Sequence, residues 1–248
     1  MSQTLDRALS ILPIVAEKPR HINEIALQLG VHHSTALRLL HTLRNHGFVF
    51  ELPDHRYRLG SATFRLGFQA LESIDLRTIA KPAMQVLSDE TGETIHLGIL
   101  EDDDVFYIEK IESVQPGIRM HSRIGTPAPL HCTGVAKAIL AYTHPARRRS
   151  LLENHDLQKF TENTLTTIDS VEADLALSVE RGYARDAEEH DAGVHCIAAP
   201  IFSGNGDVAG GMSISVPISR VDRETLLGYV PLLLKQSTAV SRALGWSN

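Results

Sequence analysis

Cysteine and long apolar runs are both scarce in this chain. Two of its 248 residues are cysteines, Cys132 and Cys196, and they lie far apart. Two cysteines in so long a chain do not form a disulfide framework, which favours a reducing compartment such as the cytoplasm. No run of about 18 apolar residues occurs, so no membrane-spanning segment is expected. Residues 1–9 lack the features of a secretory signal.

Metal-ligand motifs are also missing. The spacings CxxC and HExxH do not occur, so neither a metal nor another cofactor is predicted. What is present is an apolar content of 43%, enough to build packed cores. The length fits a small domain of roughly 60–80 residues followed by a larger one of about 170.

Charge is unevenly distributed along the chain, whose net charge is −6. Residues 1–60 contain seven Lys and Arg against five Asp and Glu, a balance of +2, and six of the thirteen histidines. A slightly basic, histidine-rich head on an acidic body is consistent with nucleic-acid binding, but the asymmetry is small.

The first part of the chain predicts three helices. Apolar periodicity indicates a helix over 4–17, which Pro13 should kink or shorten. Two further helices are predicted over 22–29 and 33–46, and each is followed by a glycine that can end it.

The third predicted helix has two contrasting faces. Ala36, Leu39, Leu40 and Leu43 form its apolar stripe. The other side carries polar and basic residues that can reach bases or phosphates, namely His33, Ser34, Thr35, Arg38 and His41. This arrangement is typical of a helix-turn-helix. The alternative is an ordinary helical hairpin with a solvated polar face.

Two strand-like runs, 48–52 and 56–59, follow around the turn Pro53-Asp54. A β-hairpin after a helix-turn-helix predicts a wing. Its Arg56, Tyr57 and Arg58 are expected to lie along DNA, and the alternative is that the two arginines are solvated edge charges. We therefore predict a winged helix-turn-helix over residues 1–60.

The rest of the chain predicts a linker helix over 61–77 and a mixed domain over 78–248, an α+β protein in all. The linker helix can transmit a signal or pack in a dimer. Strands are predicted over 94–100 and 105–111, and again over 197–202 and 208–216. Helices are predicted over 135–142, 170–181 and 222–244, and Pro231 should bend or break the last one.

A series of short motifs carries a resemblance to a known family: Glu24-Ile25-Ala26, Ser34-Thr35, Arg38-Leu39-Leu40, Gly47-Phe48-Val49, Tyr57-Arg58-Leu59-Gly60, Glu93-Thr94-Ile95-His96-Leu97, Pro129-Leu130-His131-Cys132-Thr133, Glu188-Glu189 and Gly193-Val194-His195-Cys196. With these motifs the chain resembles the IclR family of transcriptional regulators over essentially its whole length. Residues 93–98 and 119–125 most resemble the regulators that respond to 2-keto-3-deoxygluconate.

The resemblance implies a GAF-like effector domain with an antiparallel sheet, in a protein that forms dimers or tetramers. It implies a regulator, expected to be a repressor of a catabolic operon, that binds a roughly palindromic double-stranded DNA operator and a small acidic metabolite. It also implies the effector-binding positions: the backbone at Gly134 and Val135, the side chains of Asp186, Cys196, Ser213 and Ser215, and apolar walls from Met120, Ala128 and Val194.

The residues at these positions also indicate which kind of ligand the implied pocket favours. Gly134 and Val135 open a predicted helix, whose N–H groups and dipole favour an anion. Ser213 and Ser215 are two apart on a strand, so their hydroxyls share a face. A carboxylate at Asp186 would repel an anionic ligand unless it accepts hydrogen bonds from ligand hydroxyls, which favours a hydroxylated acid. The alternative is that Ser213 and Ser215 satisfy only local backbone and that Asp186 is a turn residue.

Two other functions stay open at this point. Cys196, His190 and His195 could form a metal or redox sensor. Together with Asp186 and Ser213 they also include the residue types of a nucleophile, base and acid. No nucleophile motif surrounds them, however, so no catalytic residue is predicted.

Overall fold

The computed structural model describes residues 3–72, 75–115, 120 and 122–247. The chain divides into two compact units, residues 1–73 and 74–248, each described here by itself. None of the helices in the described part of the chain combines the length and apolar character needed to cross a bilayer.

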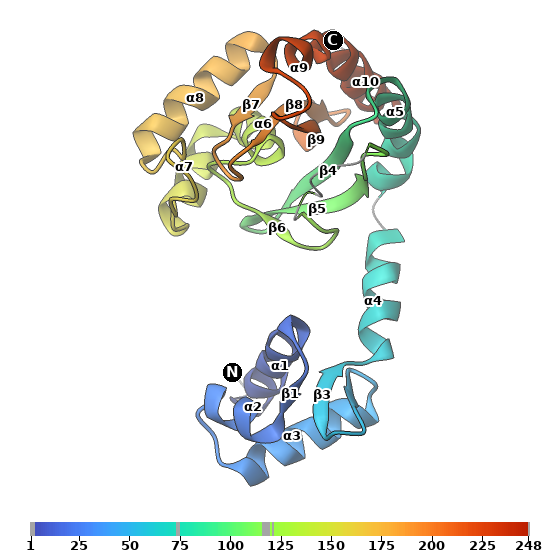
Figure 1. Cartoon of the computed structure of the whole chain (residues 1–248), viewed down its shortest axis with the longest axis vertical. Helices are drawn as coiled ribbons and strands as arrows, with labels where there is room; N and C mark the ends of the chain where they lie inside the picture. Colours follow the sequence, from blue (N-terminus) through green and yellow to red (C-terminus); the bar gives the residue numbers. More distant parts are fainter. Residues whose placement is uncertain (1–2, 73–74, 116–119, 121, 248) are drawn as a thin grey trace. The chain divides into compact units, whose positions relative to one another are not determined.

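The N-terminal unit consists of helices around a small sheet (Figure 1). Its three strands pair antiparallel in the order β1-β3-β2. In chain order the elements are α1 (Gln3–Glu17), β1 (Arg20–His21), α2 (Ile22–Gln28), α3 (His33–Asn45), β2 (Val49–Glu51), β3 (Arg56–Leu59) and α4 (Ser61–Glu72). The predicted helix-turn-helix and hairpin are therefore confirmed, and β1 is an additional strand that widens the hairpin into a sheet.

The core of this unit is built from the apolar stripes of α1, α2 and α3. Ile11, Ile25 and Leu40 are fully buried together with side chains from β2 and β3. Pro13 does not shorten α1, because the helix continues to Glu17 and Val15 beyond the proline is buried. Gly30 follows α2 with φ 61°, a conformation that favours glycine and lets the chain turn into α3.

The C-terminal unit is a six-stranded antiparallel sheet in the order β6-β5-β4-β9-β8-β7, with helices on both faces (Figure 1). The elements are α5 (Asp75–Thr91), β4 (Thr94–Glu101), β5 (Asp104–Ile111), β6 (Pro127–Ala128), α6 (Gly134–Tyr142), α7 (Pro145–Asn154), α8 (Ile168–Arg181), β7 (Ala184–Ala187), β8 (Val194–Phe202), β9 (Val208–Pro217), α9 (Arg223–Gly228) and α10 (Val230–Ala243). The final helix is split as expected, because α9 ends before Tyr229 and Pro231 lies in the first turn of α10.

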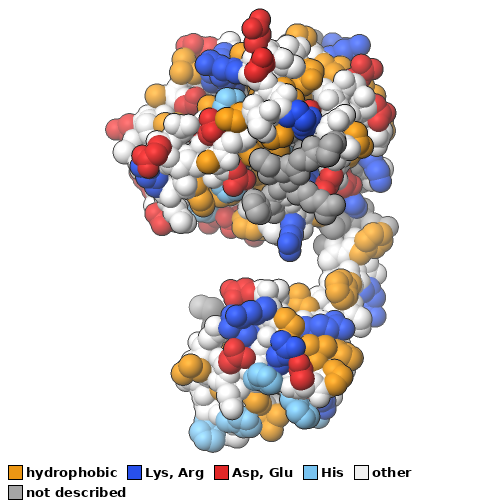
Figure 2. Space-filling view, viewed as in Figure 1, with side chains coloured by type: hydrophobic (Ala, Val, Ile, Leu, Met, Phe, Trp, Pro, Cys, Tyr) orange, Lys and Arg blue, Asp and Glu red, His pale blue; other side chains and the backbone are white. Residues whose placement is uncertain are grey.

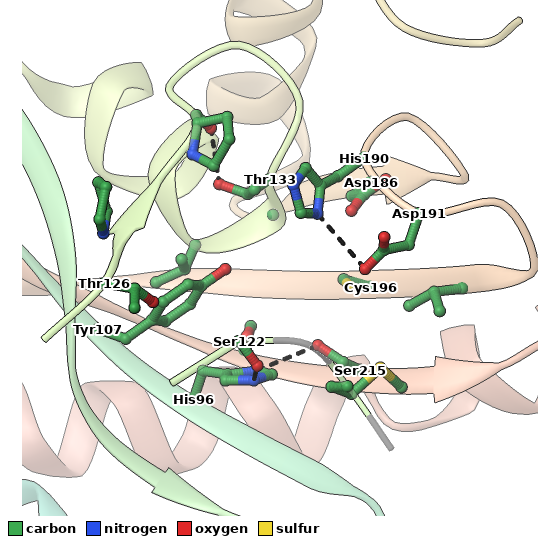
Figure 3. A pocket seen from close by; sticks show the side chains of 17 residues that line it. His96, Tyr107, Ser122, Thr126, Thr133, Asp186, His190, Asp191, Cys196 and Ser215 are labelled. Atoms are coloured by element: carbon green, nitrogen blue, oxygen red, sulfur yellow. Dashed lines mark hydrogen bonds and ion pairs between the residues drawn. The ribbon is translucent and has the colours of Figure 1, made fainter. Parts of the chain in front are cut away.

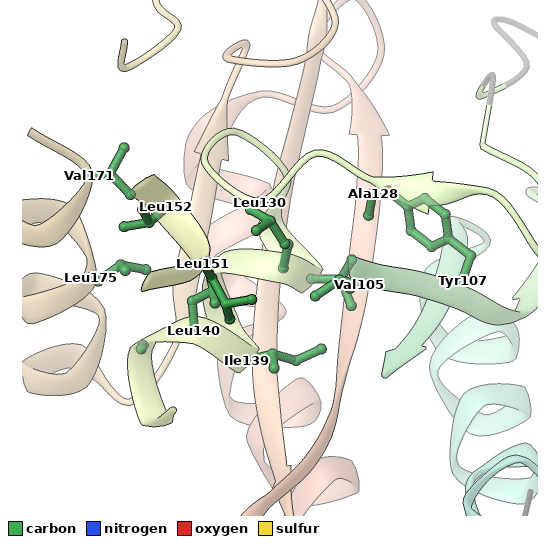
Figure 4. Close-up of a cluster of buried hydrophobic side chains, with 13 residues drawn as sticks. Val105, Tyr107, Ala128, Leu130, Ile139, Leu140, Leu151, Leu152, Val171 and Leu175 are labelled. Atoms are coloured by element: carbon green, nitrogen blue, oxygen red, sulfur yellow. The ribbon is translucent and has the colours of Figure 1, made fainter. Parts of the chain in front are cut away.

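Alternation along the strands sends side chains to two separate cores. α5 and α10 cover one face of the sheet and α6 lies on the other. On the α6 side, a buried cluster joins α6 to α7, α8 and β5 (Figure 4). Ile139, Leu151 and Leu175, one from each helix, are fully buried there. This cluster fixes α6 against the sheet, and the start of α6 forms one wall of the pocket described below.

Candidate functional site

The outer face of α3 is exposed in the N-terminal unit. His33, Ser34, Arg38 and His41 are exposed and Thr35 is half-buried, while the apolar stripe of the helix is buried. Figure 2 shows histidine side chains, together with side chains of lysine or arginine, on the visible face of this unit. His32 precedes the helix and its Nδ1 lies 2.9 Å from Ser34 Oγ, which orders the first turn. The face therefore has the short polar and basic side chains that DNA reading requires.

The predicted wing needs one correction. Tyr57 is 7% exposed and belongs to the apolar core, so it cannot lie along DNA; alternation on β3 turns its ring inward between two outward arginines. Arg56 is exposed and pairs with Asp54 at 2.6 Å. The guanidinium of Arg58 lies 4.6 Å from the centre of the Phe50 ring and donates to the Leu59 carbonyl. Arg56 therefore lies on the wing surface in an ion pair, and Arg58 is half-buried against Phe50.

The C-terminal unit contains a cavity of about 210 Å³ beside the start of α6 (Figure 3). Most of the predicted effector-binding residues line it: Met120, Gly134, Val135, Asp186, Val194, Cys196, Ser213 and Ser215. Ala128 does not, because it is 2% exposed and packs in the apolar cluster behind α6, while its neighbours Pro127 and Pro129 face the cavity. The volume is below the roughly 300–1,000 Å³ of drug-sized ligand sites, so it fits a small metabolite.

Strand pairing brings the polar residues of the cavity into one row. Asp186 on β7 is paired with Cys196 on β8, and Cys196 with Ser215 on β9. Ser213 lies two residues from Ser215 and so faces the same side. The sheet register therefore places three side chains from separate strands at the floor of the cavity.

α6 meets this row without intervening side chains. A Cβ added at Gly134 would lie 3.1 Å from the Cβ of Cys196, and one at Gly211 would lie 3.0 Å from the carbonyl oxygen of Val135. On β4, a Cβ at Gly98 would lie 3.0 Å from a Val135 methyl group. The glycines thus allow the helix backbone to rest directly on the sheet.

The start of α6 has features that favour an anion. The first N–H groups of a helix have no acceptor within it, and the helix dipole adds positive potential there. Thr133 precedes the helix, but its hydroxyl donates to the Pro129 carbonyl at 2.9 Å instead of capping the helix. The N–H groups of Gly134 and Val135 are therefore suited to a ligand carboxylate.

A chain of buried charges supports the acidic wall. Lys137 is fully buried on α6 and its Nζ lies 2.7 Å from both carboxylate oxygens of Glu189 and 2.9 Å from Asp174. The Glu189 N–H donates to Asp186 at 2.8 Å. Burial raises the pKa of Asp186 to about 7, and the Glu189 charge acts in the same direction. Asp186 can therefore hold a proton near neutral pH and stand beside an anion.

Other pocket residues had not been predicted. They are His96, Tyr107, Ser122, Thr126, Thr133, His190 and Asp191, together with the two prolines. His96 is inside a family motif, and it lies two residues before Gly98, the β4 residue that meets Val135 of α6, so the two positions share a face of the strand. His190 had been considered only as a metal or catalytic residue; its Nδ1 lies 3.5 Å from Asp191 (Figure 3), which raises its pKa.

The described residues give little support to a metal or redox sensor or to catalysis. Within the described residues, no group of three or more His, Cys, Asp or Glu is arranged to hold a metal ion. Cys196 is half-buried in the pocket wall, and desolvation raises the pKa of its thiol well above the ordinary value. A reactive or metal-binding cysteine needs the opposite shift, toward the thiolate.

Comparison with known proteins agrees with this anatomy. Residues 4–53 match the model of the IclR helix-turn-helix domain, and residues 68–242 match that of the bacterial transcriptional regulator IclR C-terminal domain. The HTH-type transcriptional regulator XynR of Escherichia coli is 38% identical over 98% of both chains. The HTH-type transcriptional regulator KdgR of Escherichia coli is 36% identical over 93% of this chain and 88% of the KdgR chain.

A solved structure of the Thermotoga maritima IclR superposes with a TM-score of 0.80 at 31% identity, covering 99% of this chain and all of that one. The two family models together account for both units of the chain. The chain therefore belongs to the IclR family, as a DNA-binding transcriptional regulator related to KdgR and XynR.

Proposed function

We propose that this regulator is controlled by a small hydroxylated acid, a sugar acid or keto acid, which binds in the cavity beside α6. The observation that carries the proposal is the convergence of the start of α6 with Asp186, Ser213 and Ser215 on one small cavity. The resemblance of residues 93–98 to regulators of the 2-keto-3-deoxygluconate type makes that compound the first candidate.

The cavity suits such a ligand on chemical grounds. A carboxylate placed at the N–H groups of Gly134 and Val135 gains charge-assisted hydrogen bonds. Asp186, in its protonated form, can donate to the same carboxylate; in its ionised form it accepts from a ligand hydroxyl. Val194 and Met120 provide the apolar contact that a short carbon chain needs.

DNA binding is assigned to the exposed face of α3 and to the wing. Ser34, Arg38 and His41 are proposed to face the major groove, with Arg56 and Arg58 on the backbone or minor groove. We propose a cytoplasmic dimer or tetramer that recognises a roughly palindromic operator and represses a catabolic operon. Effector and operator then influence each other's affinity by the same factor, because the coupling free energy is reciprocal.

The proposal is tested by thermal melting of the full chain with 2-keto-3-deoxygluconate, gluconate, glucuronate, pyruvate and glyoxylate. A ligand present at about 100 times its dissociation constant adds about 2.7 kcal/mol of stability. We expect a shift with at least one acid that is lost in Ser213→Ala. The matched control is Ser219→Ala, an exposed serine outside the pocket lining. Absence of any shift across the panel would overturn the assignment of an acidic effector.

A further inference from the structure

We infer that His96 is a specificity-determining residue, which with Ser122 forms a second, uncharged end of the effector pocket and recognises hydroxyl groups of the ligand chain. This inference rests on the proposed function, since it takes the cavity to be the effector site. It adds to that site a residue that is not among the effector-binding positions implied by the family resemblance.

The first support is the position of the imidazole (Figure 3). His96 is 4% exposed and contributes to the pocket lining. Its Nε2 lies 2.7 Å from Ser122 Oγ, and its Nδ1 lies 3.3 Å from Ser215 Oγ and 3.4 Å from Ser213 Oγ. One ring thus contacts hydroxyls from β9 and from the segment that precedes β6.

The second support is the charge state of the ring. Burial lowers the pKa of His96 to about 3, and the positive charge of Lys110 acts in the same direction. The imidazole is therefore neutral at physiological pH and has one N–H donor and one acceptor nitrogen. It gives this end of the cavity hydrogen-bonding capacity without net charge.

The number of hydrogens in this cluster determines how many hydrogen-bond donors remain for a ligand. If Nε2 carries the hydrogen, it donates to Ser122, and Nδ1 can accept from one of the two β9 serines. If Nδ1 carries the hydrogen, Nε2 accepts from Ser122, and Nδ1–H is shared between the serine oxygens. In either tautomer the ring accepts the hydrogen of one hydroxyl, and the other two hydroxyls direct theirs elsewhere. The cluster therefore retains donors for ligand oxygens.

The third support is the way Ser122 is held in place. Lys110 on β5 is the direct partner of His96 on β4, so the two side chains lie on the same face. Its Nζ donates to the carbonyl oxygens of Met120 at 3.1 Å and Ser122 at 2.9 Å. The ammonium is thus bound to backbone oxygens and to Glu112 at 3.1 Å, and it positions the serine hydroxyl against the ring.

These features select a class of ligand. The start of α6 favours one carboxylate, whereas the His96 end favours neutral hydroxyls. A second carboxylate there would be desolvated beside an uncharged imidazole, which is costly. The pocket is therefore matched to a monocarboxylic acid with a hydroxylated tail, in preference to a sugar diacid or a short keto acid without hydroxyls.

The experiment is titration calorimetry on the full chain with 2-keto-3-deoxygluconate and pyruvate, and with the pair gluconate and glucarate, which differ in one terminal carboxylate. We expect the wild type to prefer the hydroxylated monoacid in each pair by at least tenfold. His96→Leu should weaken 2-keto-3-deoxygluconate by tenfold or more and pyruvate by less than twofold. His96→Gln, whose amide can still reach Ser122, should restore part of the preference.

The control is His131→Leu. His131 is also buried, at 2% exposure, but its Nε2 bonds the Gln158 carbonyl and it is outside the pocket lining. This variant should leave the ligand ratio unchanged. If His96→Leu loses affinity equally for both ligands, or for neither, the inference is overturned. It is also overturned if the wild type binds pyruvate as tightly as the hydroxylated acid, although the proposed function then stands. Failure of every acid to bind would overturn both.

Discussion

Lys137 and Glu189 form a buried ion pair, with Nζ at 2.7 Å from both carboxylate oxygens. The pair links α6, which begins at Gly134, to the loop after β7, the strand that carries Asp186. Asp174 on α8 is a second carboxylate on the same ammonium, at 2.9 Å, and it also lies 3.5 Å from the guanidinium of Arg181. Such a pair does not by itself guarantee stability, but removal of Lys137 leaves the Glu189 carboxylate buried without its cation.

Lys137→Met should therefore destabilise the C-terminal unit by about 3–5 kcal/mol, the usual result of breaking a buried ion pair. Urea unfolding of the full chain, followed by circular dichroism, measures the change. Lys159→Met is the matched control, because Lys159 pairs with Glu162 in the open, where 52% and 93% of the side chains are exposed. It should change stability by less than about 1 kcal/mol. A small effect of Lys137→Met would mean that the carboxylates find other partners.

Asp186 should make stability depend on pH. Its pKa is raised to about 7 in the folded protein from the ordinary 3.8. Between these values the folded chain holds a proton that the unfolded chain has lost, so stability falls as pH rises toward 7 and this contribution is constant above it.

Asp186→Asn resembles the protonated form but does not titrate. The unfolding free energy of the wild type, relative to this variant, should therefore drop by about 2–3 kcal/mol from pH 5 to pH 7. Asp169→Asn is the control, since 95% of the Asp169 side chain is exposed. A difference that stays flat across this range would contradict a proton held on Asp186.

Gly134→Ala should separate ligand binding from folding. The new Cβ would lie 3.1 Å from Cys196 Cβ, so α6 and β8 must separate by a few tenths of an ångström at this point. We expect effector affinity to fall at least about tenfold, roughly 1.4 kcal/mol. The stability change should be smaller, because alanine favours the helix by up to about 1 kcal/mol.

Calorimetry with 2-keto-3-deoxygluconate and thermal melting are the two measurements for Gly134→Ala. Gly228→Ala is its control, because an added Cβ there meets no atom within 4 Å. If affinity is unchanged in Gly134→Ala, the anion does not bind at the start of this helix.

Arg38→Ala should weaken DNA binding. Fluorescence anisotropy with DNA selected by the wild type from a random pool, at several salt concentrations, measures the effect. A phosphate contact predicts a salt slope lower by about one, and a base contact predicts a loss of about 1–3 kcal/mol with relaxed sequence preference. Arg149→Ala, an exposed arginine of α7 paired with Glu153, should change neither. Unaltered affinity in Arg38→Ala would remove α3 from the reading face.

Much of the architecture could be predicted because it depends on local pattern. The apolar stripe of α3 and the glycines after α2 and α8 have direct physical causes, and the structure has Gly182 in the left-handed conformation after α8. Short elements could not be predicted this way. β1 and β6 have two residues each, and they are strands only because β3 and β5 lie beside them.

In the candidate site, too, the residues that follow a local pattern could be predicted and those that depend on distant contacts could not. Ser213 and Ser215 were predicted to share a face because alternation is a local rule, and both line the cavity. Tyr57 was misplaced because the sequence showed a basic hairpin but not which side of β3 faces α1. His96 and Ser122 were missed because they meet only through the sheet register and the Lys110 contacts, which no spacing in the sequence encodes.

The glycine contacts under α6 hold the helix on the sheet, and they are distinct from several of the side chains that determine the polarity of the pocket. The helix meets the sheet at Gly98, Gly134 and Gly211, where the nearest atoms belong to residues such as Val135 and Cys196 and not to His96, Ser122 or Val194. Substitutions at His96, Ser122 or Val194 can therefore alter which metabolite fits while the helix start stays where it is. In evolutionary terms, such a frame lets a lineage change the shape and polarity of this cavity by exchanging a few lining residues.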